Sequence, residues 1–493
     1  MADMNPATAF LRKFTVLNGA ARELWITFIV KFLSVAAYAV TNLTIKLWLS
    51  SEFGCSDKEA LALVLAWSLT MTGVTLLVGS LTDALGLRRT FFLGVWVCLA
   101  ARLVMVFATN KWLAVVGGLF PLAIGEALGT PVLVAAVRQY STTRQRSISF
   151  STVYMMMNVG FLVAGYVFDA LRNEQTGLGE HGHFVLPVLN ITITTYRALF
   201  LLSWVLELSL LPFVWYMRAG VEVTDEGLKI APAPPATAGG NIWNAFQLTV
   251  RNAVVDTVRL FAGLFKQRSF YRLLAFLGLI ACLKLILMQM YYVFPTFGIR
   301  ELGKGAPVGT LWNINSWLII FLVPLVGALT QRFPAYGMAI LGGAISAGSV
   351  FVMAMPTAWF QSAAGGVLGE WVGHWYLNLS GQVHPYYVMI ALFVTLFSIG
   401  EAFYSPRVYE YAAAIAPKGQ EASYSSLSYI PLLLGKVFTT MIGGALLSNY
   451  CPEVGERHSG TMWLVIALLA TICPVGLLVL RPYIRVHEAG RED

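Results

Sequence analysis

The segment Leu396–Pro417, LFSIGEAFYSPRVYEYAAAIAP, decides how this chain must fold. It continues the apolar run VMIALFVT, and together the two are long enough to cross a bilayer as one helix. Glu401 lies near the middle, where a charged group is costly unless it meets a partner or a polar cavity. Ser405 and Tyr409 follow at helical spacing on the same face. The pattern predicts a membrane helix with a cavity-facing carboxylate, the alternative being a glutamate in a helix–helix ion pair.

The whole composition agrees with a membrane protein built of such helices. Hydrophobic residues make up 57% of the 493 residues and charged residues only 12%, which is typical of a polytopic membrane protein. We therefore expect an all-α membrane protein. The apolar runs predict twelve spans, near residues 24–49, 60–82, 90–108, 112–137, 147–171, 196–217, 271–297, 311–330, 336–356, 385–413, 421–447 and 461–481.

The distribution of charge predicts the orientation. Most of the 33 Lys and Arg residues fall in connections on one side of the predicted membrane, which places the N- and C-termini in the cytoplasm. The basic residues do not cluster on a soluble domain, so nucleic acid is not an expected partner. There is no Walker motif, no Ser/His/Asp constellation and no metal spacing of the five cysteines. We expect no enzyme activity, cofactor or metal.

The spans divide into two groups of six. Residues 1–217 are predicted to form an N-terminal six-helix bundle and residues 271–493 a C-terminal one. Residues 218–270 form a cytoplasmic connection between them. Within it, the Pro/Ala/Gly-rich run IAPAPPATAGGN (230–241) predicts a flexible linker, and residues 242–268 predict an amphipathic helix on the inner membrane surface.

The two halves repeat each other at corresponding spans. The run GSLTD (79–83) is echoed by GALTQ (327–331), and IGEALGTP (124–131) matches IGEAFYSP (399–406). A lysine and a tyrosine seven residues apart recur in spans one and seven, as Lys31 with Tyr38 and as Lys284 with Tyr291. Three matches in the same order indicate an internal duplication with pseudo-symmetric halves.

This layout resembles the major facilitator superfamily. The run GSLTDALGLRR (79–89) is similar to the superfamily's signature between spans two and three. Its key positions are occupied by Gly79, Asp83, Gly86, Arg88 and Arg89. The resemblance implies a gating role, in which glycines let two helices approach and the charged residues make contacts that break on opening.

Within that superfamily the chain resembles the proton-dependent oligopeptide transporter (POT/PTR) family. Motifs of spans ten, five, eight and four are similar to FSIGEAFYSPRVYEY, FSTVYMMMNVG (150–160), WNINSWLIIFLVP (312–324) and AIGEALGTP (123–131). The resemblance implies that Glu401 faces the amino group of a peptide and that Asn158 faces the substrate. Asn315 stands at the asparagine of the span-eight motif.

The chain departs from this family at the residues that handle protons. The family's E-x-x-E-R in span one becomes Lys31, Ser34 and Val35, its span-four lysine becomes Thr130, and Glu126 appears one turn earlier. Because an unpaired charge would be costly here, we expect a swapped pair, Lys31 with Glu126. Lys284 with Glu401 would repeat the pair in the second half. The departure leaves protons as one candidate coupling ion.

These observations predict a secondary active transporter, with a cavity at the midplane between the two halves and lipid bilayer around it. A symporter of a small peptide-like solute is what the resemblance implies. A carrier of another substrate class, a drug or a metabolite, and a non-transporting nutrient receptor remain alternatives. The oligomeric state is open. The expected substrate-binding residues are Glu401, Asn158, Asn315, Tyr38, Gln289 and Tyr291; those expected in gating or coupling are Gly79, Asp83, Gly86, Arg88, Arg89, Lys31, Glu126 and Lys284.

Overall fold

The computed structural model describes most of the chain. The described residues are 17–186, 191–218, 220–224, 227–230, 262–330, 333–415 and 430–485, with the single residues 247, 251 and 255. The predicted linker 230–241 and amphipathic helix 242–268 lie mostly outside them. So do the side chains of Gly79, Asp83 and Tyr409.

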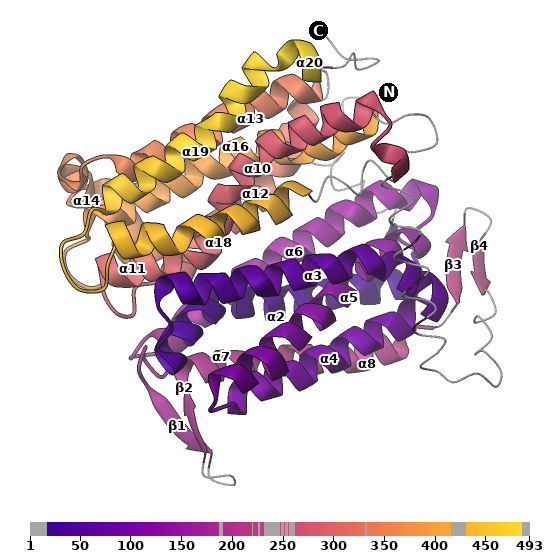
Figure 1. Cartoon of the computed structure of the whole chain (residues 1–493), viewed down its shortest axis with the longest axis horizontal. Helices are drawn as coiled ribbons and strands as arrows, with labels where there is room; N and C mark the ends of the chain where they lie inside the picture. Colours follow the sequence, from indigo (N-terminus) through magenta and orange to yellow (C-terminus); the bar gives the residue numbers. More distant parts are fainter. Residues whose placement is uncertain are drawn as a thin grey trace. The chain divides into compact units, whose positions relative to one another are not determined.

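Helices dominate the described residues (Figure 1). Those that coincide with the first six predicted spans are α2 (Arg22–Phe53), α3 (Asp57–Leu85), α4 (Leu87–Phe107), the π-helix η2 (Leu113–Leu119) continuing into α5 (Phe120–Gln139), α6 (Thr143–Arg172), and α7 (Thr195–Leu208) with α8 (Leu210–Tyr216). Those at the second six are α10 (Arg268–Tyr292) with α11 (Phe294–Leu302), α12 (Val308–Leu329), α13 (Ala335–Ala354), α16 (Pro385–Ile415), α18 (Ile430–Tyr450) and α19 (Ser459–Val479). A short α20 (Arg481–Ile484) follows α19.

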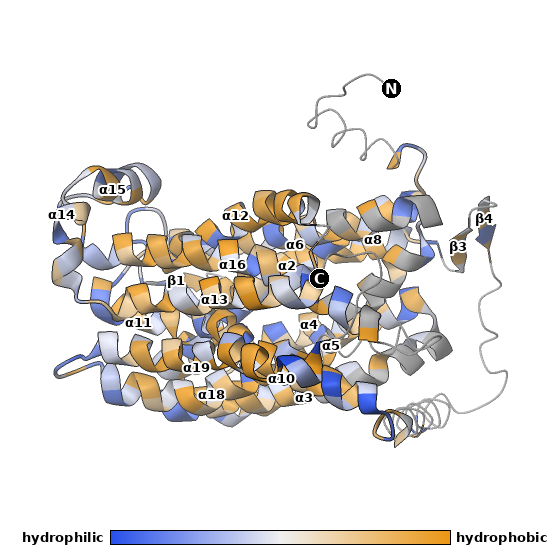
Figure 2. Ribbon diagram, turned by 90° about the horizontal axis from the view of Figure 1, so that it is seen from above, coloured by the Kyte–Doolittle hydropathy of each residue, from blue (hydrophilic) through white to orange (hydrophobic). Residues whose placement is uncertain are grey.

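Ten of the described helices are long and apolar enough to cross a membrane. Their outward faces are apolar as well, as in α12, where Phe321 and Leu325 are 66% and 54% exposed. Figure 2 shows apolar residues along the length of helices such as α12 and α19. A helix that is apolar on its exposed face is stable when lipid covers that face.

The described chain forms two compact units. Unit 1 comprises Met1–Thr41, Leu69–Ala164 and Arg197–Phe261; unit 2 comprises Asn42–Ser68, Gly165–Tyr196 and Ala262–Asp493. These limits cut through α2, α3, α6 and α7, so one end of the N-terminal helices is grouped with the C-terminal helices. We call this end of unit 2 the outer end, after the predicted orientation. The predicted bundles 1–217 and 271–493 follow different limits and stay a prediction.

Glycines bring equivalent helices together in the two units. In unit 1, a Cβ at Gly94 of α4 would lie 3.1 Å from the carbonyl oxygen of Gly125 in α5. In unit 2, a Cβ at Gly342 of α13 would lie 2.6 Å from the carbonyl oxygen of Gly400 in α16. Gly125 and Gly400 are the glycines of the matched IGEA motifs, so the sequence repeat is also a repeat of helix packing.

Two hairpins were not expected from the sequence. Strands β1 (His183–Leu186) and β2 (Ile191–Thr194) pair antiparallel in unit 2, with His183 opposite Thr194. Strands β3 (Val221–Thr224) and β4 (Gly227–Ile230) pair in the same way, within the predicted cytoplasmic connection. The alternation of ITIT and VEVT was the available signal, but four-residue strands are short for a period-two pattern.

The connection between α13 and α16 is ordered into short turns. It contains the 3₁₀ turn η3 (Thr357–Phe360), α14 (Gln361–Ala364), α15 (Val367–Gly369) and the π-helix η4 (Glu370–Tyr376). These turns pack on α16 in unit 2.

Candidate functional site

The strongest candidate site is a cluster of polar side chains around Glu401 in unit 2. Glu401 is 5% exposed on α16. Its Oε1 accepts a hydrogen bond from Lys284 Nζ on α10 at 3.3 Å, which is also an ion pair. Its Oε2 accepts one from Asn315 Nδ2 on α12 at 3.1 Å. The structure therefore brings together three of the predicted site residues, and it contains the expected Lys284–Glu401 pair.

Small residues make this cluster possible. The contact between Gly342 and Gly400 seats α16 against α13 directly beside Glu401. On the other side, a Cβ at Gly435 of α18 would lie 2.8 Å from the backbone carbon of Lys284, so α18 presses on α10 at the lysine itself. Close helix approach of this kind fixes where the long lysine side chain starts.

The ammonium of Lys284 has further contacts besides Glu401. Its Nζ donates to Ser405 Oγ at 3.3 Å and lies 5.0 Å from the ring centre of Tyr404. Ser405 stands one turn after Glu401, as its spacing predicted. The lysine thus has a hydroxyl and an aromatic face within reach when the carboxylate is occupied by another cation.

Gln289 and Tyr291 lie further along α10. Gln289 is fully buried, and neither atom of its side-chain amide has a hydrogen-bond partner among the described residues. Tyr291 is packed edge-on to Trp312 of α12, with the ring centres 6.2 Å apart. Trp312 in turn lies 6.1 Å from Phe397 of α16. The polar cluster is therefore flanked by an aromatic wall, whereas the buried amide of Gln289 lies near Gly443 of α18.

Unit 1 contains a second buried charge centre, and its composition corrects one expectation. Glu126 of α5 pairs with Arg102 Nη2 of α4 at 2.6 Å and not with Lys31. Arg102 Nη1 also pairs with Glu207 of α7 at 3.1 Å, and its Nε donates to Ser203 Oγ at 2.6 Å. Arg102 is fully buried.

A helix contact that is present in both halves explains why Glu126 pairs with Arg102 and Glu401 with Lys284. Gly125 packs against Cys98 of α4, as Gly400 packs against Ser346 of α13. One turn beyond Cys98 stands Arg102, whereas one turn beyond Ser346 stands the fully buried Val350. The first half therefore supplies a cation to its glutamate from α4. The second half cannot, and its glutamate takes Lys284 instead.

The other predicted residues of unit 1 lie apart from this centre or contact their own helix. Lys31 is 7% exposed on α2, and the part of the chain that the structure describes offers it no ion pair. Asn158 is buried on α6 and donates to the carbonyl oxygen of Tyr154, one turn earlier, at 2.9 Å. Tyr38 is half-buried on α2. Their substrate-binding roles stay predictions.

The predicted gating motif forms the turn between α3 and α4. Gly86 has φ 82°, a left-handed conformation that favours glycine. Arg88 Nη2 donates to the carbonyl oxygen of Trp215 at the end of α8, at 2.9 Å, and its guanidinium lies 5.6 Å from that indole. Arg89 is exposed. Within unit 1, Arg88 thus ties the α3–α4 turn to α8.

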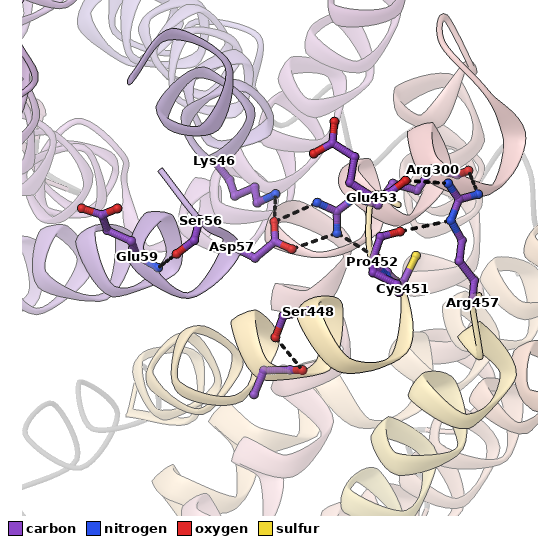
Figure 3. A network of polar contacts seen from close by, with 11 residues as sticks. Lys46, Ser56, Asp57, Glu59, Arg300, Ser448, Cys451, Pro452, Glu453 and Arg457 are labelled. Carbon is purple, nitrogen blue, oxygen red and sulfur yellow. Dashed lines mark hydrogen bonds and ion pairs between the residues drawn. The ribbon is translucent and has the colours of Figure 1, made fainter. Parts of the chain in front are cut away.

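A network at the outer end of unit 2 was missed by the sequence reasoning (Figure 3). Asp57, at the start of α3, accepts from Lys46 Nζ of α2 at 2.6 Å and pairs with both terminal nitrogens of Arg300 of α11. Arg300 Nη1 also donates to the carbonyl oxygen of Cys451, at 2.7 Å. Arg457 then donates to the carbonyl oxygen of Arg300. The network joins the ends of N-terminal helices to α11 and the α18–α19 loop.

Asp57 precedes the predicted span 60–82, and its charge is stabilised by this network. Burial raises its pKa, but the ammonium of Lys46 and the guanidinium of Arg300 lower it by more, so the pKa of Asp57 lies below its ordinary value. A second contact joins the same end: Asp169 of α6 accepts from the backbone N–H groups of Gly309 and Thr310, at the start of α12. Only the three-dimensional structure could have revealed the contacts of Asp57 with Arg300 and of Asp169 with Gly309, because these partners are far apart in sequence.

Comparison with known proteins agrees with this architecture. Residues 27–373 match the family model described as Major Facilitator Superfamily. No curated protein sequence matches the chain. Among the described residues, no group of three or more metal-ligating side chains is found.

Solved structures of similar fold include several peptide transporters. A peptide transporter POT in complex with sulfate is 16% identical, with a TM-score of 0.64 over 94% of this chain and 95% of that one. A POT family transporter in complex with 5-aminolevulinic acid is 14% identical, with a TM-score of 0.64 over 94% and 97%. An auto-inhibited POT family peptide transporter is 14% identical, with a TM-score of 0.66 over 96% and 99%. These similarities show the all-α major facilitator fold that the sequence predicted. The match to the family model shows that the protein is a transporter and not an enzyme, and that the chain belongs to the Major Facilitator Superfamily.

Proposed function

We propose that this chain is a secondary active transporter of small zwitterionic, peptide-like solutes, and that Glu401 receives the amino group of the solute. The observation that carries the proposal is the buried Glu401 carboxylate, whose only cation among the described residues is the flexible Lys284. A substrate ammonium can replace Lys284 at Oε1 without leaving the carboxylate unpaired. The similarity in fold to peptide transporters and the span-ten motif support the same substrate class.

Exchange at Glu401 also provides a route to coupling. When an ammonium or a proton occupies the carboxylate, Lys284 moves to Ser405 and the Tyr404 ring, which it already contacts. The ion pair between α10 and α16 is then broken, which changes the relative stability of conformational states. Protons are thus a candidate coupling ion at Glu401.

Other buried residues of unit 2 suit a peptide. The buried amide of Gln289 offers a donor and an acceptor, which is the pairing that a peptide group requires. Tyr291 and Trp312 offer an aromatic wall for side chains. Asn158 and Tyr38 of unit 1 are proposed as further substrate contacts.

The test is a pair of ligands that differ only at the amine. Purified protein is heated with alanyl-alanine or with N-acetyl-alanyl-alanine at two pH values, and uptake of both is measured in proteoliposomes. We expect the free amine to raise the unfolding temperature and to be transported, and the acetylated analogue to do neither. Glu401→Gln should weaken binding of the free amine about ten- to a hundredfold, since one charge-assisted hydrogen bond contributes about 1.5–3 kcal/mol.

Glu370→Gln is the matched control, because that carboxylate is exposed on η4. Equal binding of the two ligands, or Glu401→Gln with unchanged affinity for the free amine, would return Glu401 to a structural role.

A carrier of another substrate class is favoured by one observation. The charge centre of unit 1 uses Arg102 and Glu207, and neither residue belongs to the family motifs that suggested peptides. A screen of amino acids, drugs and metabolites in the same thermal assay separates the two classes. A non-transporting receptor would bind a ligand in that assay and show no uptake in proteoliposomes.

A further inference from the structure

The connection between α13 and α16 has a surface that the transport function does not use. We call residues 357–377 the outer platform; it comprises η3, α14, α15 and η4. Figure 2 shows α14 and α15 set apart at one end of unit 2, on the side where α12 lies.

In the platform the small residues are mostly buried and the large apolar residues are mostly exposed, which is the reverse of the packing in a water-soluble segment. Most of its buried residues are small: Ala364 is 6% exposed and Gly369 and Gly373 are buried, with Leu377 the one large buried residue. A Cβ at Gly369 would collide with the carbonyl oxygen of Ala364, and one at Gly373 with the side chain of Val383. These positions hold glycine because the backbone lies directly on its neighbours.

Five large apolar residues of the platform point outward. They are Trp359, Val367, Leu368, Trp371 and Trp375, with exposed fractions of 69%, 75%, 47%, 61% and 77%. Such a set in water would be costly and prone to association. The stable environment for it is an apolar one.

The aromatic and polar groups place that environment at the membrane interface. The rings of Trp371 and Trp375 lie 5.3 Å apart, so they form one indole surface. Glu370 and His374 lie on the same turns, 3.9 Å apart, and remain solvent-accessible. Indoles beside charged groups are typical of the headgroup region, because the ring is apolar and its N–H is polar.

The contacts of Tyr376 fix the depth of the platform. Its hydroxyl donates to the carbonyl oxygen of Thr310 at 2.8 Å, in the first turn of α12. The exposed face of α12 continues from there through Trp317, Phe321 and Leu325. The platform therefore lies level with the start of a membrane-spanning helix whose exposed face is apolar.

We propose that the outer platform is a lipid-binding surface, on which Trp371 and Trp375 insert into the headgroup–acyl boundary of the outer leaflet. The platform is also joined to the outer end of unit 2. Thr310, which holds Tyr376 through its carbonyl oxygen, donates its N–H to Asp169 of α6. Lipid bound to the platform thus acts on a residue that links α6 to α12.

The test is fluorescence quenching at two engineered cysteines. Trp375→Cys carries an environment-sensitive fluorophore (NBD) on the platform, and Val454→Cys carries it on the α18–α19 loop, where Val454 is 88% exposed. Both proteins are reconstituted in phosphatidylcholine nanodiscs. The native cysteines are buried or half-buried, and the unmutated chain measures their background labelling.

We expect the label at 375 to be quenched several-fold more by lipids with a nitroxide near the headgroup than by aqueous iodide. The label at 454 should show the opposite ranking. A label at 375 that iodide quenches as strongly as at 454, or that neither quencher reaches, would overturn the proposal in favour of water or a protein partner. Where Trp375→Cys does not fold, Val367→Cys on the same surface decides the question in the same way.

Discussion

At the scale of single residues, the two halves solve the same problem with different partners. Glu126 and Glu401 occupy equivalent places in the repeated IGEA motif, and the carboxylate of each is paired with a cation. The cation is Arg102 in the first half and Lys284 in the second. A guanidinium can serve two carboxylates through separate nitrogens, as Arg102 does for Glu126 and Glu207, whereas an ammonium is more easily exchanged. The first centre is therefore suited to hold helices together, and the second to exchange its partner.

This difference predicts which double mutants recover stability. Arg102→Met should lower stability by about 3–5 kcal/mol, because it leaves two buried carboxylates without their cation. Adding Glu126→Leu should restore part of this loss. Lys31→Met combined with Glu126→Leu should instead give additive losses, because Lys31 and Glu126 are not paired. Thermal unfolding of the purified single and double variants measures the stability losses for both pairs of residues. Additive losses for Arg102 with Glu126 would show that their ion pair contributes nothing.

At the scale of helices, glycine contacts set the positions of the charged groups. The contact of Gly342 with Gly400 fixes α16 against α13, and with it the position of Glu401. The equivalent contact of Gly94 with Gly125 fixes α5 against α4 and brings Glu126 to Arg102. Apolar surface alone would not select these positions, since each helix is apolar on most faces.

The importance of this contact is tested by adding one methyl group. Gly342→Ala places a Cβ 2.6 Å from a backbone oxygen, so α13 and α16 must separate. We expect a loss of about 1–3 kcal/mol in stability together with weaker substrate binding. Gly348→Ala is the control on the same helix, because nothing lies within 4 Å of that Cβ. Equal unfolding temperatures for the two variants would mean that the helices accommodate the methyl group.

At the scale of the whole molecule, contacts at the outer end join segments far apart in the sequence. Asp57 is held by Lys46 and Arg300, and the loop that follows α18 is held by Arg300 and Arg457. In a transporter that works by alternating access, such contacts must break when this end opens. The network is therefore expected to stabilise the state seen in this structure.

Removing the charge of Asp57 should loosen this end. In Asp57→Asn we expect labelling of the buried Cys451 by a membrane-impermeant thiol reagent to rise about tenfold, since a charge-assisted contact contributes about 1.5–3 kcal/mol. Glu59→Gln, an exposed carboxylate two residues away that points out of the network in Figure 3, should leave labelling unchanged. Equal labelling of the two variants would exclude a closing role for Asp57.

The same experiment has an expected pH dependence. Because the pKa of Asp57 is lowered in the folded protein, its ion pairs persist above that value and are lost only as the pH falls through it. The ratio of labelling between variant and parent should thus be the same at about pH 6 and pH 8. A ratio that falls towards one at pH 6 would assign a higher pKa to the group that closes this end.

The orientation of the whole molecule in the membrane is also a prediction. The excess of Lys and Arg in one set of connections predicts that the termini and residues 218–270 lie in the cytoplasm. A cysteine introduced at position 237 should be labelled by an impermeant reagent only after the membrane is permeabilised. Labelling in intact cells would reverse the predicted orientation.

Several features of this protein were determined by the sequence itself. Spans of apolar residues predict membrane helices because each helix satisfies its own backbone hydrogen bonds, so hydropathy along the chain is sufficient. The internal repeat could be recognised in the sequence because duplicated segments keep the residues that fix helix packing, such as the glycines of IGEA. The pair of Lys284 with Glu401 was predictable, because each was a costly charge on a helix that the repeat and the family motifs placed near the other.

Only the tertiary structure decided the remaining contacts. The sequence shows that Arg102 and Glu207 are charges within apolar runs, each of which needs a partner, but not that both converge on the face of α5 that carries Glu126. The close approach of α4 to α5 at Gly94 brings Arg102, and not Lys31, to Glu126. In the outer network, Asp57 and Arg300 lie 243 positions apart, and the platform is recognised by which of its side chains are exposed. Charge partners are selected by which helix faces meet in space, and no local pattern along the chain encodes that meeting.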